Sequence, residues 1–175
     1  MKTVVFGGSG FLGSHVADRL SELGHDVVIF DIKQSPYLTA GQSMVIGDIL
    51  DIEQVQNAID GCDFIYNFAG LADMELATNK PLATVHANIT GAINIMEAAV
   101  KAKVQRLIYA SSVYVYSQKG GFYRCSKQAT ELYLEEYQRT YDLNFTIMRY
   151  GTLYGPRAGR DNAIFLKNRY QQELD

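Results

Sequence analysis

The chain contains few of the residues that build metal sites and disulfide-linked folds. Its two cysteines, Cys62 and Cys125, fall in different expected elements, and its three histidines are scattered. Neither set has the spacing of metal ligands, so we expect no metal site. Free thiols are typical of a reducing compartment, and we therefore expect a cytoplasmic protein.

An excess of charge and long apolar runs are also missing. The formal net charge is −3, from 16 basic and 19 acidic residues, which gives no electrostatic attraction to nucleic acid or to an anionic membrane. No apolar run reaches the roughly 20 residues that a membrane-spanning helix needs. The start of the chain does not have the pattern of a signal peptide. We therefore expect neither nucleic acid nor a membrane as a partner.

What the chain does contain is a regular alternation of short apolar runs and longer segments of helical periodicity. Hydrophobic residues make up 47% of it, enough for the core of one domain. The apolar runs predict strands at Thr3–Phe6, Asp26–Phe30, Ser43–Ile46, Phe64–Phe68, Arg106–Ala110 and Phe145–Arg149. The periodic segments predict helices at Phe11–Leu23, Ile52–Ile59, Pro81–Lys101 and Phe122–Tyr141, and another from Asn162 to the end. This alternation indicates an α/β fold, with a doubly wound parallel sheet flanked by helices.

A glycine-rich turn joins the first expected strand to the first expected helix. Gly7, Gly10 and Gly13 have the spacing G-x-x-G-x-x-G. Glycine lets a pyrophosphate approach the main chain, and the helix that begins at Phe11 and Leu12 offers free N–H groups to it. An isolated glycine-rich turn is weak evidence, but this one lies in the strand–turn–helix context that dinucleotide binding requires.

An acidic residue follows the glycine turn at the distance expected for a dinucleotide site. Asp31 ends the second strand, eighteen residues after Gly13. A carboxylate there can accept hydrogen bonds from the adenosine ribose and would repel a 2′-phosphate, which favours NAD over NADP. The Lys33 ammonium has the opposite charge and favours NADP instead.

Residues that follow the third and fourth strands extend this expected site. The Asp48 carboxylate can meet the adenine amino group, with Ile49 against the ring. Asp48 could instead cap the next helix, but Asp51 is better placed for that role. The fourth strand ends in residues that leave room for a cofactor, namely Phe68, Ala69 and Gly70.

Tyr123 and Lys127 lie four positions apart at the start of a long amphipathic segment, so a helix puts both on one face. A nearby cation lowers a phenol pKa that is ordinarily about 10. The pair therefore predicts a proton acceptor that is usable near neutral pH. Ser112 ends a buried strand eleven residues before Tyr123. In the alternative interpretation Ser112 caps a strand end and Tyr123 is a surface tyrosine.

Occurring together and in order, these motifs resemble the extended short-chain dehydrogenase/reductases, and within them the NAD-dependent sugar-nucleotide epimerase/dehydratase family. The resemblance extends over essentially the whole chain. It also rests on Asn88-Ile89-Thr90-Gly91, on Tyr109–Tyr116 and on Arg149–Pro156. It implies a Rossmann-like fold, NAD as the cofactor and a nucleotide sugar as the substrate.

The resemblance also implies roles for individual residues. Ser112 would hydrogen-bond the reacting hydroxyl, and Tyr123 would be the general acid and base. Lys127 would hold the nicotinamide ribose and lower the pKa of the tyrosine. Asn88 would lie behind the cofactor, and Tyr150 would lie against its nicotinamide end.

Departures from the family pattern narrow the expected reaction. Val113 and Tyr114 stand where dehydratases carry Asp-Glu, which argues against sugar dehydration and for an epimerase of the UDP-glucose 4-epimerase kind. Tyr114 and Thr152 are the expected substrate contacts beside Ser112. The short bridge Ser117–Gly121 indicates an unusual substrate. The alternatives are a reductase or dehydrogenase of a sugar or another carbonyl, and a module or inactive fragment that merely binds NAD.

The resemblance implies a division of the chain and an oligomeric state. Residues 1–155 would form the NAD-binding domain, and residues 156–175 would begin a substrate-binding lobe that is otherwise missing from a truncated or naturally short protein. Helices 82–100 and 122–141 are apolar over a wide arc. The resemblance implies that they form a homodimer interface of four helices, whereas contact with the missing lobe is the alternative.

Overall fold

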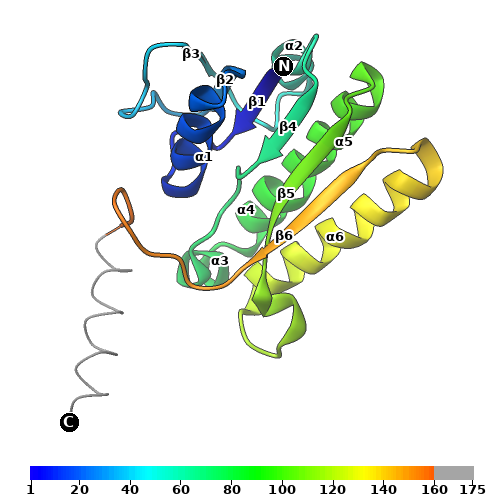
Figure 1. Cartoon of the computed structure of the whole chain (residues 1–175). Coiled ribbons are helices and arrows are strands. Elements are labelled where there is room, and N and C mark those ends of the chain that lie inside the picture. The colour runs from blue at the N-terminus through cyan, green and yellow to red at the C-terminus, as the bar shows by residue number, and fades with distance from the viewer. Residues whose placement is uncertain (160–175) are drawn as a thin grey trace.

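The computed structural model describes residues 1–159, which form a six-stranded parallel sheet with helices on both faces (Figure 1). The strands are β1 (Lys2–Phe6), β2 (Asp26–Asp31), β3 (Gln42–Ile46), β4 (Phe64–Asn67), β5 (Arg106–Ser112) and β6 (Phe145–Tyr150). Their order is β3-β2-β1-β4-β5-β6, and every neighbouring pair is parallel. The predicted fold class is therefore confirmed. The order reverses direction between β1 and β4, where sheets of this kind bind ligands at the carboxyl ends of the strands.

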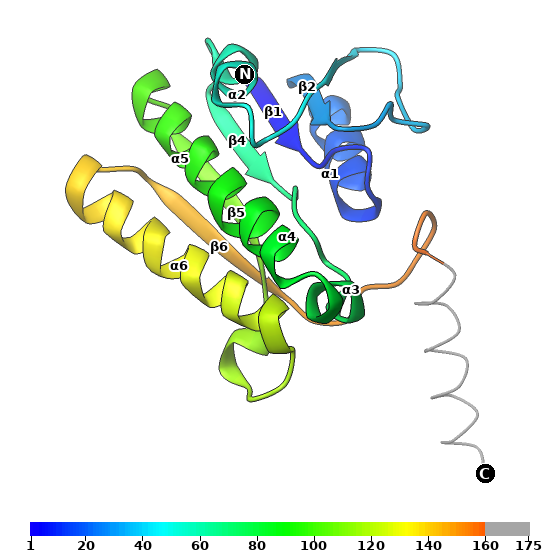
Figure 2. The ribbon, with the colours of Figure 1, turned by 180° about the vertical axis from the view of Figure 1, so that it is seen from behind.

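The helices divide between the two faces of the sheet. They are α1 (Phe11–Glu22), α2 (Ile52–Ile59), α3 (Met74–Asn79), α4 (Pro81–Val85), α5 (Gly91–Ala102) and α6 (Gly121–Tyr141), with a π-helical turn at His86–Thr90 and a 3-10 turn at Val113–Tyr116. Helix α1 lies on one face, while α4, α5 and α6 lie on the opposite face (Figure 2).

Each face of the sheet has its own hydrophobic core, because successive side chains of a strand point to opposite sides. Val4 and Phe6 of β1 pack into the larger cluster, which includes residues of α2 and α5. Val5 points the other way and packs against Ala17 and Leu20 of α1. The central strand is thus buried on both faces, as its run of β-branched residues predicts.

The predicted helix Pro81–Lys101 is wrong in detail, because the structure divides it into α4, the π-turn and α5. The π-turn contains the buried Asn88, whose side chain bonds to two other segments.

Helix α3 was not predicted, since six residues are too few to show a period. Its N-cap, Asp73, accepts a hydrogen bond from Leu76 N at 2.8 Å. The helix predicted from Asn162 lies outside the described residues. None of the helices in residues 1–159 has the length and hydrophobicity needed to cross a membrane.

Candidate functional site

The glycine turn fits tightly between β1, β4 and α1. A Cβ atom on Gly7, whose φ is +74°, would lie 2.6 Å from Ala69 N, and one on Gly13 would lie 2.3 Å from Gly7 O. Helix α1 begins after Gly10, which offers no side-chain acceptor, and its first turn has no acidic residue. The first N–H groups of α1 are therefore available to an anion from outside the helix.

Two adjoining pockets follow the carboxyl edge of the sheet. The Asp31 pocket has a volume of about 590 Å³, and the Tyr123 pocket a volume of about 540 Å³. Both are lined by Gly7, Gly10 and Gly70. They therefore form one groove that passes the N-terminus of α1.

The Asp31 pocket gathers the residues predicted around an adenosine. The two carboxylate oxygens of Asp31 accept hydrogen bonds from Ser9 N at 3.0 Å and Lys33 N at 3.2 Å, which orients the group beside the glycine turn. Asp48 also lines the pocket, and Asp51 caps α2, as predicted, by accepting from two backbone N–H groups. The predicted residues that line this pocket are Gly7, Gly10, Asp31, Asp48, Ile49, Phe68, Ala69 and Gly70.

The Tyr123 pocket brings together the end of β5 and the first turns of α6. Lys127 is buried, and its Nζ atom donates a hydrogen bond to Ala110 O at 2.7 Å. The same atom lies 4.8 Å from the ring centre of Tyr109 and 5.7 Å from that of Tyr123. The predicted residues that line this pocket are Gly7, Gly10, Phe11, Leu12, Gly13, Phe68, Gly70, Ser112, Tyr114, Tyr123, Lys127, Tyr150 and Thr152.

The prediction of a lowered phenol pKa is wrong for this arrangement of side chains. Burial raises the pKa of Tyr123 and outweighs the hydrogen bond with Ser112, which lowers it. Burial also lowers the pKa of Lys127 to about 8, against the opposing effect of Glu131. The Lys127 ammonium is directed at the Ala110 carbonyl, and this low-polarity setting disfavours charge on both groups.

Asn88 lies behind the wall of the groove and lines neither pocket. Its Oδ1 atom accepts from Leu71 N at 2.6 Å, while its Nδ2 atom donates to Leu71 O and to Ser126 Oγ. A Cβ atom on Gly70 would lie 2.6 Å from Asn88 Oδ1. Asn88 therefore fastens the loop that follows β4 to helix α6, which is consistent with a place behind a cofactor.

Sequence reasoning missed Glu131, which lies one helical turn after Lys127. Its buried carboxylate accepts hydrogen bonds from Ser111 Oγ and, at 3.1 and 2.8 Å, from Arg149 Nε and Nη2. These bonds from Ser111 of β5 and Arg149 of β6 tie α6 to the carboxyl ends of both strands behind Lys127. The spacing of four residues from Lys127 is the one signal in the sequence that could have indicated it. The wall formed by Met74 and Leu76 was also missed, because α3 was not predicted.

The groove fits a dinucleotide cofactor in its donors, acceptors and shape. The open N-terminus of α1 suits a pyrophosphate, and no side chain fits where Gly7 and Gly13 leave the backbone bare. Asp31 presents a carboxylate at one end of the groove, and Tyr123 and Lys127 present a phenol and an amine at the other.

Known proteins are similar to most of the chain. A UDP-glucuronate 4-epimerase of Arabidopsis thaliana is 28% identical over 97% of the chain and 46% of its own length. A UDP-N-acetyl-alpha-D-glucosaminuronate decarboxylase of Bacillus cytotoxicus is 28% identical over 90% of the chain and 56% of its own length. The crystal structure of UDP-glucose 4-epimerase from Thermus thermophilus in complex with NAD matches with a TM-score of 0.84 and 27% identity, over 95% of the chain and 61% of that structure.

The chain therefore spans about half the length of these curated relatives. The model of one protein family matches residues 3–172, which is nearly the whole sequence. By this match the chain belongs to the NAD dependent epimerase/dehydratase family.

Proposed function

We propose that this chain carries the NAD-binding and acid–base portion of a UDP-sugar 4-epimerase. One observation carries the proposal: a single groove joins the glycine turn and Asp31 to the group of Ser112, Tyr123 and Lys127. The named relatives support the substrate class, since they act on UDP-sugars.

The residues that would hold NAD follow the groove from end to end. Asp31 would accept hydrogen bonds from the adenosine ribose, and Asp48 would meet the adenine. The first N–H groups of α1 would hold the pyrophosphate. Lys127 would donate to the nicotinamide ribose, with Tyr150 at the nicotinamide end. NAD, when bound, supplies a reversible acceptor for hydride from the sugar carbon.

The acid–base work would fall to Tyr123. Its phenolate, which the raised pKa makes a minor form at neutral pH, would take the proton of the sugar hydroxyl, and the phenol would return it after the sugar has turned over. Ser112 would orient the hydroxyl oxygen. Lys127 would stabilise the negative charge on the phenolate while the proton is away. Tyr114 and Thr152, which line the same pocket, would contact the sugar.

Titration and product analysis would test this proposal. We expect calorimetry to show NAD binding that is tighter than NADP binding, because Asp31 would repel a 2′-phosphate. Absence of NAD binding at millimolar cofactor would refute the proposal. With UDP-glucose or UDP-glucuronate as substrate, an epimerase yields the 4-epimer without net reduction of NAD. Net reduction would instead identify a dehydrogenase, and release of carbon dioxide would identify a decarboxylase.

We also infer a homodimer through helices 82–100 and 122–141. Leu134 and Tyr137 of α6 are buried in the core, but other large apolar side chains of these helices are exposed. These are Leu82, Val85, Phe122, Leu132, Tyr133 and Tyr141. A second copy that packs the same helices against them would remove this apolar surface from water.

A further inference from the structure

The segment after β6 crosses from one side of the groove to the other. We call residues 151–158 the strap. It leaves β6, passes α3 and reaches α1 (Figures 1 and 2). Gly151, Thr152 and Leu153 line the Tyr123 pocket, and Pro156 and Arg157 contact α1 and its surroundings. The strap therefore forms a wall at the nicotinamide end of the proposed NAD site.

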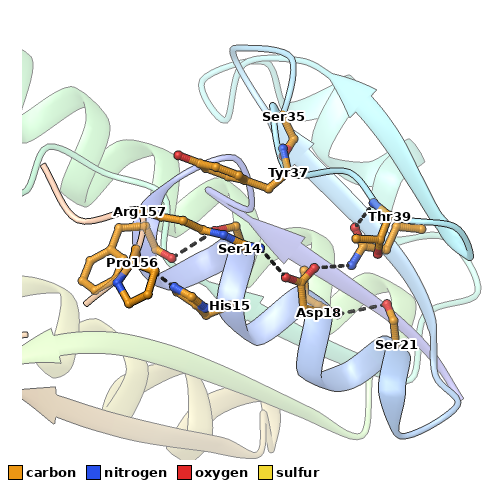
Figure 3. Close-up of polar contacts among 12 residues, drawn as sticks. Ser14, His15, Asp18, Ser21, Ser35, Tyr37, Thr39, Pro156 and Arg157 are labelled. Carbon is orange, nitrogen blue, oxygen red and sulfur yellow. Dashed lines mark hydrogen bonds and ion pairs between the residues drawn. The ribbon is translucent and has the colours of Figure 1, made fainter. Parts of the chain in front are cut away.

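Arg157 joins three separate segments at the far end of the strap. Its Nη2 atom pairs with Asp18 Oδ2 of α1 at 2.8 Å, and its guanidinium lies 4.5 Å from the ring centre of Tyr37 (Figure 3). Tyr37 belongs to the loop of residues 32–41, which follows Asp31. The other carboxylate oxygen of Asp18 accepts from Gln42 Nε2 at 3.0 Å. Arg157 is thus a link between the strap, α1 and the Asp31 loop.

A second contact holds the strap to the same helix. His15 Nε2–H donates to the carbonyl oxygen of Pro156 at 2.8 Å, across 141 positions of sequence (Figure 3). Because a carbonyl can only accept, this bond requires the proton on Nε2.

The link is more enclosed than an ordinary surface ion pair. The side chains of Arg157 and Asp18 are each 23% exposed, whereas those of Arg19 and Glu22, also on α1, are 67% and 63% exposed. Arg157 Nη1 is buried without a partner among the described residues, and the backbone of Arg157 has a φ of +70°. A non-glycine residue holds such a conformation where the surrounding contacts enforce it, often at functional sites.

We propose that Arg157 is a positioning residue for the dinucleotide site. It couples the strap at one end of the groove to the Asp31 loop at the other end. This inference rests on the proposed function. Lys33 N donates to Asp31 Oδ1, so the position of the loop bears directly on the acid that would hold the adenosine. Arg157 touches neither pocket and acts through Tyr37 and the strap.

The coupling predicts a cost in affinity when the link is broken. If the strap and the loop adopt their joined arrangement only part of the time, apparent affinity falls in proportion to that fraction. By the same linkage, a ligand at one end of the groove stabilises the other end.

Hydrogen exchange tests the coupling without any ligand. Arg157→Gln should speed exchange of the Thr39 and Gln42 amides in and beside the loop, and Tyr37→Leu should speed exchange of the Ala158 amide in the strap. These amides are hydrogen-bonded in the structure, to Gln42 Oε1, Thr39 O and Gly155 O. Arg19→Gln, which removes the same charge from an exposed pair on α1, should change none of them. Effects confined to the segment that carries each substitution would overturn the proposal.

Ligand titration tests the consequence for binding. We expect Arg157→Gln to weaken both NAD and AMP roughly tenfold, since one ion pair and one cation–π contact are lost. We expect Arg19→Gln to leave both affinities unchanged. AMP lacks the nicotinamide half that would lie by the strap, so its weakening reports on the Asp31 loop. If Arg157→Gln weakens NAD binding but leaves AMP binding unchanged, Arg157 stabilises only the strap. That result would overturn the proposed coupling.

Two further observations keep this test decisive. Arg157→Lys retains the charge but not the planar group, and we expect an intermediate effect on NAD affinity. If Arg157→Gln does not fold, Arg157→Lys takes its place in the experiments. If the wild-type chain binds neither NAD nor AMP, the proposed function fails, while the exchange experiment still decides whether Arg157 couples the two segments.

Discussion

Lys127 places a cationic group in a setting that favours its neutral form. Burial lowers its pKa to about 8 from the ordinary 10.5. The folded state therefore binds fewer protons than the unfolded state between these two values, and wild-type stability rises with pH across that window. Below pH 8 the charged ammonium destabilises the fold, a cost that is consistent with a functional site.

We accordingly expect Lys127→Met to raise the free energy of unfolding at pH 7 by about 3 kcal/mol, the value of the pKa shift at 1.36 kcal/mol per unit. The gain should shrink as pH rises from 8 and disappear above about 10.5. Urea denaturation of both proteins across this range measures it. A difference in stability that does not change with pH would contradict the assignment.

Gly13 shows a steric requirement at the scale of one atom. A Cβ atom there would lie 2.3 Å from Gly7 O, so we expect Gly13→Ala to displace α1 and lower stability by about 1–3 kcal/mol. Gly159→Ala is the control, because a Cβ atom at Gly159 has no neighbour within 4 Å. Thermal unfolding of both variants measures the effect, and equal stability of the two would show that the turn relaxes at little cost.

At the scale of elements, helix α6 has large apolar side chains both on the side that packs into the core and on its outer, exposed side. Leu134 is 0% exposed in the core, while Leu132 is 65% exposed on the outer side. This division follows the helical period. The sequence predicted an apolar arc wider than one core-facing stripe needs, and the structure shows which residues lie on each side.

The outer side of α6 leads to a prediction about assembly. We expect light scattering at micromolar concentration to give the mass of two chains for the wild type and of one chain for Leu132→Glu. The free energy of unfolding of the separated chains should change by less than about 0.5 kcal/mol, because the site is exposed in a single chain. Leu134→Ala, by contrast, should cost about 2–5 kcal/mol. A wild-type mass equal to one chain would contradict the proposed dimer.

At the scale of the whole molecule, the groove crosses the sheet at its switch point and joins its two halves. A ligand bound there should stabilise all of the described fold as one unit. With NAD at a hundred times its dissociation constant, we expect the free energy of unfolding to rise by about 2.7 kcal/mol. NADP at the same concentration should give a smaller gain because of Asp31. Thermal denaturation measures both, and equal gains would argue against the role of Asp31.

The sequence by itself determined the elements whose signals are local. The β-branched runs, the helical periods and the glycine turn specify the strands, the main helices and the start of α1, because each depends on residues within a few positions. Together with the family resemblance, these signals placed every predicted pocket residue except Asn88 along one groove.

Only the tertiary structure decided the features that join distant positions. The pair of Glu131 and Arg149 spans 18 residues, and the contact of His15 with Pro156 spans 141. The hydrophobic period of the sequence cannot predict these contacts, because they depend on how β5, β6, α1 and α6 pack together. The pKa of Tyr123 belongs to the same class: the sequence indicated a neighbouring cation, but the depth of burial decides the direction of the shift.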